Sequence, residues 1–345
     1  MTTAMQSTVT REISFRDAVN ECLRQEMELD DNVIIMGEEI AGGAGRQDQG
    51  VEDAWGGVMG LTKGLHGKFG KRILDTPISE SAFIGAAIGA ATAGLRPVAE
   101  LMFVDFIGVC MDQLVNNAAK MRYMFGGQVA VPFTMMTRIG AGFGAAAQHS
   151  ESYYSIFSHI PGLKGVCPSD AYTAKGLLAA SIRDDDPVVF FEHKGLYGTT
   201  CPVPEEPYVL PLGKARTVRE GTDITLVGIS KMTWVCTAAA EELAKEGINC
   251  EVIDLLSISP IDYDHINESV LKTHRLVVVD EDTPICSMAS EICSRVAEEV
   301  FDYLDAPPSR VTAPHTPVPY SRAMENEYMP NETRVIATVR KLINR

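Results

Sequence analysis

The sequence predicts an α/β protein in which two domains each contain a largely parallel sheet covered by helices. The chain has 345 residues, which corresponds to two domains of about 150 residues each. Short β-branched apolar runs alternate with longer helical patterns, and this alternation favours parallel sheets with helices on their faces. Between His193 and Arg216 the sequence becomes dense in proline and glycine without a helical period, which indicates a connection between domains.

The first half contains apolar runs that predict strands and longer patterns that predict helices. The strands are expected at residues 32–36, 72–74, 97–102, 132–138, 163–168 and 187–192. The helices are expected at residues 15–29, 80–95, 106–125 and 171–183. Buried parallel strands deliver residues at their carboxyl ends to one edge of the sheet. The two carboxylates that end the run DNVIIMGEE therefore mark a candidate site at that edge.

The second half repeats the alternation. Strands are expected at residues 224–229, 250–254 and 276–280, and helices at residues 234–246, 288–305 and 332–343. Prolines in APPSRVTAPHTPVPY predict turns before the last helix. We expect one domain at residues 1–195, a linker at 196–215 and a second domain at 216–345.

Composition and charge exclude several classes of protein. The formal charge is −16, from 30 basic and 46 acidic residues, so a nucleic-acid partner is not expected. The longest near-apolar run, residues 83–95, is shorter than the roughly 18 residues of a membrane-spanning helix. The first residues lack the apolar core of a signal peptide. We therefore expect a soluble, cytoplasmic protein without a membrane partner, whose eight cysteines are mostly buried thiols.

The common self-contained catalytic motifs are missing from the sequence. It contains no G-x-G-x-x-G dinucleotide loop, no phosphate-binding P-loop and no G-x-S-x-G nucleophile motif. The seven histidines include no H-x-x-x-H pair. These absences disfavour an enzyme that binds nucleotides alone, a serine hydrolase and a zinc enzyme.

Three local features remain as candidates, each with a structural alternative. Glu80 in DTPISE begins a predicted helix, where a carboxylate either serves a site or caps the first turn. Gly85 and Gly89 in that helix cost about 1 kcal/mol each relative to alanine, which close helix packing inside the fold or between subunits would offset. His149 follows a loop rich in glycine and alanine, where ligand-facing groups are often presented, although most single histidines are structural.

Several segments together resemble a known family. They include MGEEI, RILDTPISESAFIGAAIG, DQLVNNAAKMRYMFGG, AAAQHS, HIPGLKGVCPS and EELAKEGINCEVIDLLSISPID, in this order. The chain resembles the beta subunits of thiamin-diphosphate-dependent 2-oxo acid dehydrogenases over roughly residues 12–343. Within this family, ELMFVDFIGVCMDQ and RVTAPHTPVPYS are most similar to acetoin dehydrogenases.

This resemblance implies a pyrimidine-binding thiamin-diphosphate fold in the first half and a transketolase-type C-terminal domain in the second. It also implies that thiamin diphosphate is shared with an alpha subunit, which holds the diphosphate and Mg²⁺ through a motif beginning G-D-G. This chain contains no G-D-G. The expected partners are that alpha subunit, in an α₂β₂ heterotetramer, and a lipoyl-bearing acetyltransferase.

The resemblance also assigns roles to individual residues. Glu80 matches the glutamate that hydrogen-bonds the pyrimidine ring, and Phe106 matches the aromatic side chain that stacks on that ring. His149 matches the catalytic histidine that faces the substrate and the lipoyl group. The other implied residues of the cofactor pocket are Glu38, Ile78 and Met102. The positions matching a monovalent cation site, K⁺ in this family, are Phe133, Ser181, Ile182, Asp184 and Asp186.

The expected function is therefore the beta subunit of an acetoin dehydrogenase that cleaves acetoin and transfers the acetyl group to a lipoyl arm. The alternative within the family is a pyruvate or branched-chain 2-oxo acid dehydrogenase. A non-catalytic scaffold that only binds a partner is the alternative of a different class, and the presence of Glu80 argues against it.

Overall fold

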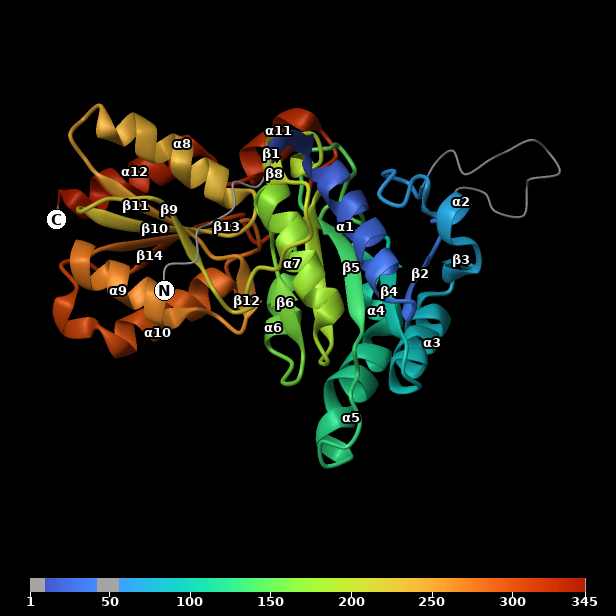
Figure 1. Ribbon diagram of the computed structural model, residues 1–345. Coiled ribbons are helices and arrows are strands. Elements are labelled where there is room, and N and C mark those ends of the chain that lie inside the picture. Colours follow the sequence, from blue (N-terminus) through green and yellow to red (C-terminus); the bar gives the residue numbers. More distant parts are fainter. Residues whose placement is uncertain (1–9, 42–55, 345) are drawn as a thin grey trace, which may run out of the picture.

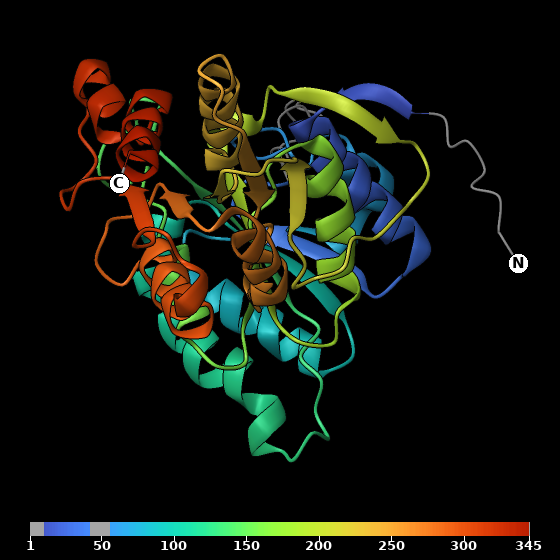
Figure 2. The ribbon, with the colours of Figure 1, turned by 90° about the vertical axis from the view of Figure 1, so that its left-hand side faces the viewer.

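The computed structural model describes residues 10–41 and 56–344, which form two α/β domains side by side (Figure 1). Each domain has its own sheet with helices on both faces, as the sequence predicts. Figure 2, viewed from the side of the second domain, shows the orange and red elements of that domain in front of the blue and green elements of the first. Within the described residues, no helix is both long enough and apolar enough to cross a membrane.

The first sheet has seven strands in the order β12-β6-β7-β5-β4-β2-β3. Its parallel strands are β2 (Val33–Gly37), β3 (Ile73–Asp75), β4 (Arg96–Leu101), β5 (Thr134–Ile139), β6 (Lys164–Val166) and β7 (Val188–His193). All six strands predicted from the first half are confirmed, with boundaries that shift by one to two residues. β12 (Ser257–Ser259), from the second half of the chain, adds an antiparallel edge.

Two helices cover one face of the first sheet. They are α1 (Phe15–Leu29) and α7 (Ala171–Arg183), and both have the predicted boundaries. A buried ion pair joins them, because Lys175 Nζ lies 2.7 Å from Glu21 Oε1. The Lys175 ammonium also donates to the carbonyl oxygen of Pro204 at 2.7 Å, so its charge is compensated although it is buried.

The opposite face carries α3 (Glu80–Thr92), α4 (Ile107–Asp112), α5 (Ala119–Met124) and α6 (Tyr154–Ser158), while a short α2 (Leu65–Phe69) precedes β3. α3 ends three residues before its predicted end because Gly94 adopts a left-handed φ of 101°. The helix predicted at residues 106–125 is interrupted by a π-helical turn, η4 (Gln113–Ala118). Three-residue 3₁₀ turns lie at η2 (Gly70–Arg72), η3 (Val104–Phe106) and η5 (Lys194–Leu196).

The second sheet has the order β14-β13-β10-β11-β9. Its strands are β9 (Arg216–Arg219), β10 (Ile224–Gly228), β11 (Cys250–Asp254), β13 (Leu276–Asp280) and β14 (Ser309–Thr312), and only β9 is antiparallel. α8 (Met232–Ala244) and α12 (Glu332–Ile343) cover one face; α9 (Tyr263–Thr273) and α10 (Met288–Glu299) cover the other (Figure 1). The helix predicted at 288–305 ends at Glu299 and is followed by a separate turn, η6 (Phe301–Tyr303).

Three segments cross the expected domain boundary. The stretch 196–215, expected to be an irregular linker, contains β8 (Thr200–Pro204), which pairs antiparallel with β1 (Thr10–Ser14) as Figure 2 shows. β12 joins the first sheet. α11 (Arg322–Tyr328) lies apart from α12 and against the first domain (Figure 1). β12 and α11, which follow the expected boundary in the sequence, therefore pack against the first domain.

Candidate active site

The carboxyl ends of the parallel strands carry the residues that the sequence singled out. Glu38 follows β2, Glu80 begins the helix after β3, and Met102 and Phe106 follow β4. His149 lies in the loop after β5. This edge is where open α/β sheets bind ligands, because the loops after neighbouring strands converge there.

Glu38 and Glu80 form an acidic pair at this edge. Both side chains are buried, with 7% and 9% of their surface exposed. Burial raises the pKa of Glu38, and the nearby carboxylates of Glu80 and Glu100 raise it further. One oxygen of Glu38, Oε1, is buried without a hydrogen-bond partner among the described residues. Glu38 is therefore suited to hydrogen-bond a buried polar ligand atom beside Glu80.

An ion pair inside the sheet lies beneath these acids. Arg138 Nη2 on β5 is 2.9 Å from Glu100 Oε2 on β4, and both side chains are almost fully buried. Arg138 also donates to the carbonyl oxygen of Met102 at 3.0 Å. Burial works to lower the pKa of Arg138, but the Glu100 carboxylate and nearby Tyr197 and Glu192 raise it overall. The guanidinium therefore stays charged and fixes the backbone at Met102.

The imidazole of His149 packs between two aromatic side chains. Its centroid lies 4.8 Å from the Phe103 ring and 5.5 Å from the Phe106 ring, and both contacts are edge-to-face. The two phenylalanine rings are also edge-to-face with each other, at 5.7 Å. These contacts restrict the orientation of the imidazole, and they join Phe106 and His149 in one aromatic cluster.

Two charged side chains, the buried Lys194 and the half-buried Asp105, hold the backbone around His149. Lys194, at the end of β7, donates to the carbonyl oxygen of His149. Asp105 accepts hydrogen bonds from the amides of Ser150 and Glu151, each at 3.3 Å. Burial lowers the pKa of Lys194 to about 8, although Asp105 opposes this shift. The structure thus holds the peptide groups that directly follow the α-carbon of His149.

A second group of acidic side chains lies near the backbone that follows His149. Burial raises the pKa of Glu151 to about 7, with further contributions from Asp105 and Asp282. Burial also raises the pKa of Asp282 to about 7, helped by Asp280. These carboxyl groups come from both domains, since Asp280 ends β13 and Asp282 lies just beyond it. They form a buried acidic region that gains or loses protons close to neutral pH.

Among the residues predicted to line the cofactor pocket, Ile78 is largely exposed to solvent. Its side chain is 84% exposed, although it lies in the segment between β3 and α3, just ahead of Glu80. The side chains of Glu38 and Glu80 are buried, whereas Phe106 is half-buried. The site is therefore closed on its acidic side and open on the side of Ile78.

The positions expected to bind a monovalent cation gather at the carboxyl end of α7. Lys164 Nζ lies 2.8 Å from Asp184 Oδ2 and 3.1 Å from Asp186 Oδ2, so both carboxylates already have a cationic partner. Arg96 Nη1 donates to the carbonyl oxygens of Ile182 and Asp184. Nearby, the Ser181 carbonyl accepts from the Asp184 amide, and the Phe133 carbonyl accepts from the amide of Val188. In the described part of the chain, no group of three or more histidine, cysteine, aspartate or glutamate side chains is arranged to hold a metal ion.

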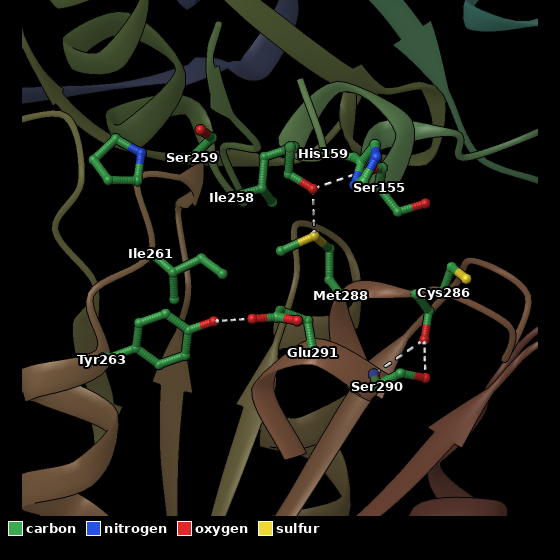
Figure 3. A pocket seen from close by; sticks show the side chains of 13 residues that line it. Ser155, His159, Ile258, Ser259, Ile261, Tyr263, Cys286, Met288, Ser290 and Glu291 are labelled. Atoms are coloured by element: carbon green, nitrogen blue, oxygen red, sulfur yellow. Dashed lines mark hydrogen bonds between the residues drawn. The ribbon is translucent and has the colours of Figure 1, made fainter. Parts of the chain in front are cut away.

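A separate cavity of about 700 Å³ lies at the junction of the two domains (Figure 3). Its lining includes Ser155, His159, Tyr263, Cys286 and Glu291, with the Tyr263 hydroxyl donating to Glu291 at 3.1 Å. None of the sequence-predicted site residues lines it. The cavity is thus distinct from the acidic and aromatic site.

Sequence reasoning missed the charges that support the site. Glu100, Arg138 and Lys194 all lie within or directly after apolar strand runs, in VAEL, MMTRIG and FFEHK. A charged residue inside a run that reads as a buried strand needs a partner, because an isolated buried charge is costly. The charged residues within apolar runs could be recognised in the sequence, but their partners on other strands and loops could be identified only from the fold.

Comparisons with known proteins agree with this architecture. The transketolase pyrimidine binding domain matches residues 11–200, and the transketolase C-terminal domain matches residues 213–335. The chain is 53% identical to the beta subunit of acetoin:2,6-dichlorophenolindophenol oxidoreductase from Cupriavidus necator, covering 96% of this chain and 98% of that one. It is 42% identical to a mitochondrial pyruvate dehydrogenase E1 component subunit beta-2 from Oryza sativa, covering 97% and 87%.

A solved structure supports the fold. The split gene transketolase, described as an inactive beta4 tetramer, superposes with a TM-score of 0.77 at 21% identity, covering 96% of this chain and 99% of that one. The chain therefore belongs to the family of the acetoin oxidoreductase and pyruvate dehydrogenase E1 beta subunits, in which a transketolase pyrimidine-binding domain precedes a transketolase C-terminal domain.

Proposed function

We propose that the chain is the beta subunit of a thiamin-diphosphate-dependent acetoin dehydrogenase, which cleaves acetoin and passes the acetyl group to a lipoyl arm. The observation that carries this proposal is the 53% identity to an acetoin oxidoreductase beta subunit over nearly the whole chain. Pyruvate dehydrogenase beta subunits are 42 to 44% identical and supply the alternative function, oxidative decarboxylation of pyruvate or a branched 2-oxo acid.

The acidic and aromatic site fits the aminopyrimidine of thiamin diphosphate. A ring nitrogen of this heterocycle needs a buried carboxyl group, and Glu80 is buried at the start of α3. The unpartnered Oε1 of Glu38 is a second acceptor suited to a polar edge of the same ring. Phe106 provides an apolar face for stacking, and Met102 is held in place through its carbonyl oxygen by Arg138.

In the proposed reaction each residue of this chain has a limited task. Bound thiamin diphosphate supplies a nucleophilic carbon for the carbonyl group of the substrate. Glu80 holds a proton at the ring nitrogen of the aminopyrimidine, and its burial excludes the water that would compete for that proton. Glu38 raises the local density of negative charge, and Phe106 orients the ring. His149 transfers a proton to or from the substrate during acyl transfer to the lipoyl group.

An alpha subunit completes the site in this proposal and holds the diphosphate and Mg²⁺. Two observations support it. The chain has no G-D-G sequence with which to bind the diphosphate, and Ile78, which follows Asp75 and precedes Glu80, is 84% exposed. We propose an α₂β₂ assembly and a lipoyl-bearing acetyltransferase as the partners. A location in the cytoplasm is part of the proposal and is supported by the bacterial acetoin relatives.

α3 offers a surface for this assembly. On the face opposite its buried side chains, Ala82, Ala86 and Gly89 are exposed, and none of these side chains is larger than a methyl group. Gly85 instead lies against Gln113 of the same chain, which an added Cβ atom would approach to 3.2 Å. A Cβ atom added at Gly89 would meet nothing within 4 Å among the described residues beyond its chain neighbours and the backbone of α3, so no packing contact within residues 10–41 and 56–344 requires glycine there. Close approach of another subunit would give that glycine a reason.

A monovalent cation at the end of α7 also remains a proposal. The carbonyl groups of Phe133, Ser181 and Ile182 already accept hydrogen bonds within the chain. The Lys164 ammonium already pairs with Asp184 and Asp186. A bound cation would therefore share its carboxylate ligands with that ammonium group.

The substrate is tested with the chain co-expressed with its alpha subunit. The purified complex is assayed with acetoin, pyruvate and branched 2-oxo acids, using an artificial electron acceptor to record turnover. We expect the highest kcat/KM for acetoin, because the chain is more similar to acetoin oxidoreductases than to pyruvate dehydrogenases. A higher kcat/KM for pyruvate would replace the proposed function with its alternative.

Replacing Glu80 by glutamine tests the acid–base role of that residue. Glu80→Gln keeps the shape of the side chain but removes the exchangeable carboxyl proton, so kcat should fall by about two to four orders of magnitude. Sedimentation of the complex should remain unchanged. Glu39→Gln is the matched control, since it removes a carboxylate that follows Glu38 in the sequence and is exposed to solvent. Near wild-type turnover by Glu80→Gln would show that the carboxyl group has another role.

Cofactor binding by the isolated chain tests the shared site. Titration calorimetry of this chain alone should show negligible binding of thiamin diphosphate in the presence of Mg²⁺. The complex with the alpha subunit should bind it, because the diphosphate-binding groups then become available. Tight binding by the isolated chain would mean that the site is complete without a partner.

Enlarging Gly89 tests the role of α3 in assembly. The isolated chain should accept Gly89→Leu, because the position is open to solvent within this chain. In the co-expressed complex the same side chain should separate the contacting backbones and shift the sedimentation boundary toward smaller species, with a parallel loss of activity.

The smaller change Gly89→Ala provides the graded control. It should stabilise the isolated helix by about 1 kcal/mol through its higher helix propensity, yet weaken assembly less than leucine does. An unchanged boundary for Gly89→Leu would indicate that α3 packs against no other subunit.

A further inference from the structure

The loop that carries His149 begins with three glycines in left-handed conformations. Gly140, Gly142 and Gly144 have φ values of 95°, 103° and 66°. At Gly140 a Cβ atom would lie 2.1 Å from His193 Nε2, so only glycine fits there. Where residues of positive φ alternate with residues of ordinary φ, successive amide groups can turn toward a common point and form a concavity that binds anions. The loop is therefore shaped to enclose negative charge.

Two carboxylates of the second domain fill this concavity. Glu281, directly after β13, accepts the amide of Ala141 at 2.6 Å. Glu325, on α11, accepts the amides of Gly142 and Gly144 at 2.7 and 2.9 Å. Each oxygen of the Glu325 carboxylate takes one of these bonds, so both are engaged by the loop. Hydrogen bonds of amides to a charged carboxylate are short and strong.

The carboxylate of Glu325, unlike that of Glu281, has no further hydrogen-bond partner among the described residues. Glu281 also bonds His193 at 2.8 Å, and that imidazole accepts the amide of Gly195 through Nδ1. Glu325 is 1% exposed. Across residues 10–41 and 56–344, it forms no salt bridge, and both hydrogen bonds of its carboxylate come from the loop. Lys194 contributes a favourable positive charge from further away. A buried carboxylate held in this way loses its compensation if the loop moves.

Apolar packing seals the same contact. Ala141 is fully buried in a small cluster with Ala313, Val318 and Tyr328, all from the second domain. Met329 closes this cluster at the end of α11. Figure 1 shows α11 separated from α12 and placed against the first domain. The position of α11 is thus explained by its contact with the loop rather than by packing on its own sheet.

We infer that Glu325 is a positioning residue, which fixes the loop from Gly140 to His149 and thereby orients the His149 imidazole for proton transfer. The inference rests on the proposed function, because it takes His149 as the residue that transfers the proton. Glu325 holds the amino-terminal part of the loop, whereas Lys194 and Asp105 hold the backbone around His149. The second domain therefore has a defined task in the reaction, although none of the residues assigned to the cofactor pocket belongs to it.

The test uses the complex of this chain with its alpha subunit. Glu325→Ala removes both acceptor oxygens, whereas Glu325→Gln keeps one acceptor and places an amide group against the second glycine. With the substrate that the complex turns over, kcat should fall by about 10- to 100-fold in Glu325→Ala, as expected for a misplaced catalytic group. The decrease should be smaller in Glu325→Gln, and KM should change little because substrate binding is not affected.

Hydrogen–deuterium exchange gives a readout independent of activity. The peptide covering residues 140–149 should exchange faster in both variants, with the larger change in Glu325→Ala, while peptides of α8 and α12 keep their wild-type rates. Glu327→Gln is the matched control, because it removes an exposed carboxylate from the same helix. Wild-type exchange at residues 140–149 in Glu325→Ala, or equally faster exchange throughout the second domain, would overturn the inference.

A double substitution shows whether Glu325 acts through His149. If it does, Glu325→Ala combined with His149→Ala should be no slower than His149→Ala alone, since the residue being positioned is already absent. Multiplicative losses in kcat would overturn the inference and give Glu325 a separate role. Wild-type turnover by His149→Ala would instead refute the proposed role of His149, and faster exchange in Glu325→Ala would still identify Glu325 as the anchor of the loop.

Discussion

The electrostatics of the site depend on the buried ion pair between Glu100 and Arg138. These side chains lie on adjacent central strands, where neither charge could be buried alone without a penalty of several kcal/mol. The pair affects the pKa values of carboxyl groups on both sides of it in the sheet. Glu100 contributes to the raised pKa of Glu38, and Arg138 opposes the burial that raises the pKa of Glu192 to about 8. The ion pair thus modifies the pKa shifts of Glu38 and Glu192 that burial causes.

The two domains meet at the carboxyl ends of their parallel strands, and this explains why charged groups concentrate there. β7 ends at His193 and β13 is followed by Glu281, and these two residues bond across the boundary at 2.8 Å. Because His193 Nδ1 accepts the amide of Gly195, the ring proton lies on Nε2, which donates to Glu281. Burial lowers the pKa of His193, which favours this neutral form. At this junction, polar groups of the first domain such as the His193 imidazole and the amides of the glycine loop bond carboxylates of the second domain. The loop that carries His149 is one of the elements held at this junction.

Much of the fold could be predicted from the sequence because the central strands are continuous apolar runs and helices such as residues 15–29 have a clear period. The missing elements depend on tertiary contacts. β12 is a three-residue strand that exists through its pairing with β6, and β1 pairs with β8 from the far end of the first domain. The π-helical turn at Gln113–Ala118 changes backbone hydrogen bonding without changing the apolar pattern. Such features have no signal in periodicity alone.

In the candidate site, too, some residues can be predicted from local sequence features, whereas others are identified only by their tertiary contacts. Glu80 and His149 stand out in sequence because each follows a recognisable local feature, a helix start or a small-residue loop. Glu325 has no such signal, since it lies in the polar segment RAMENEY, where a glutamate normally faces water. Its burial results from α11 docking against the glycine loop of the other domain. A residue whose role is to hold another residue is therefore found from its contacts, because its chemistry is ordinary and only its place in the fold is unusual.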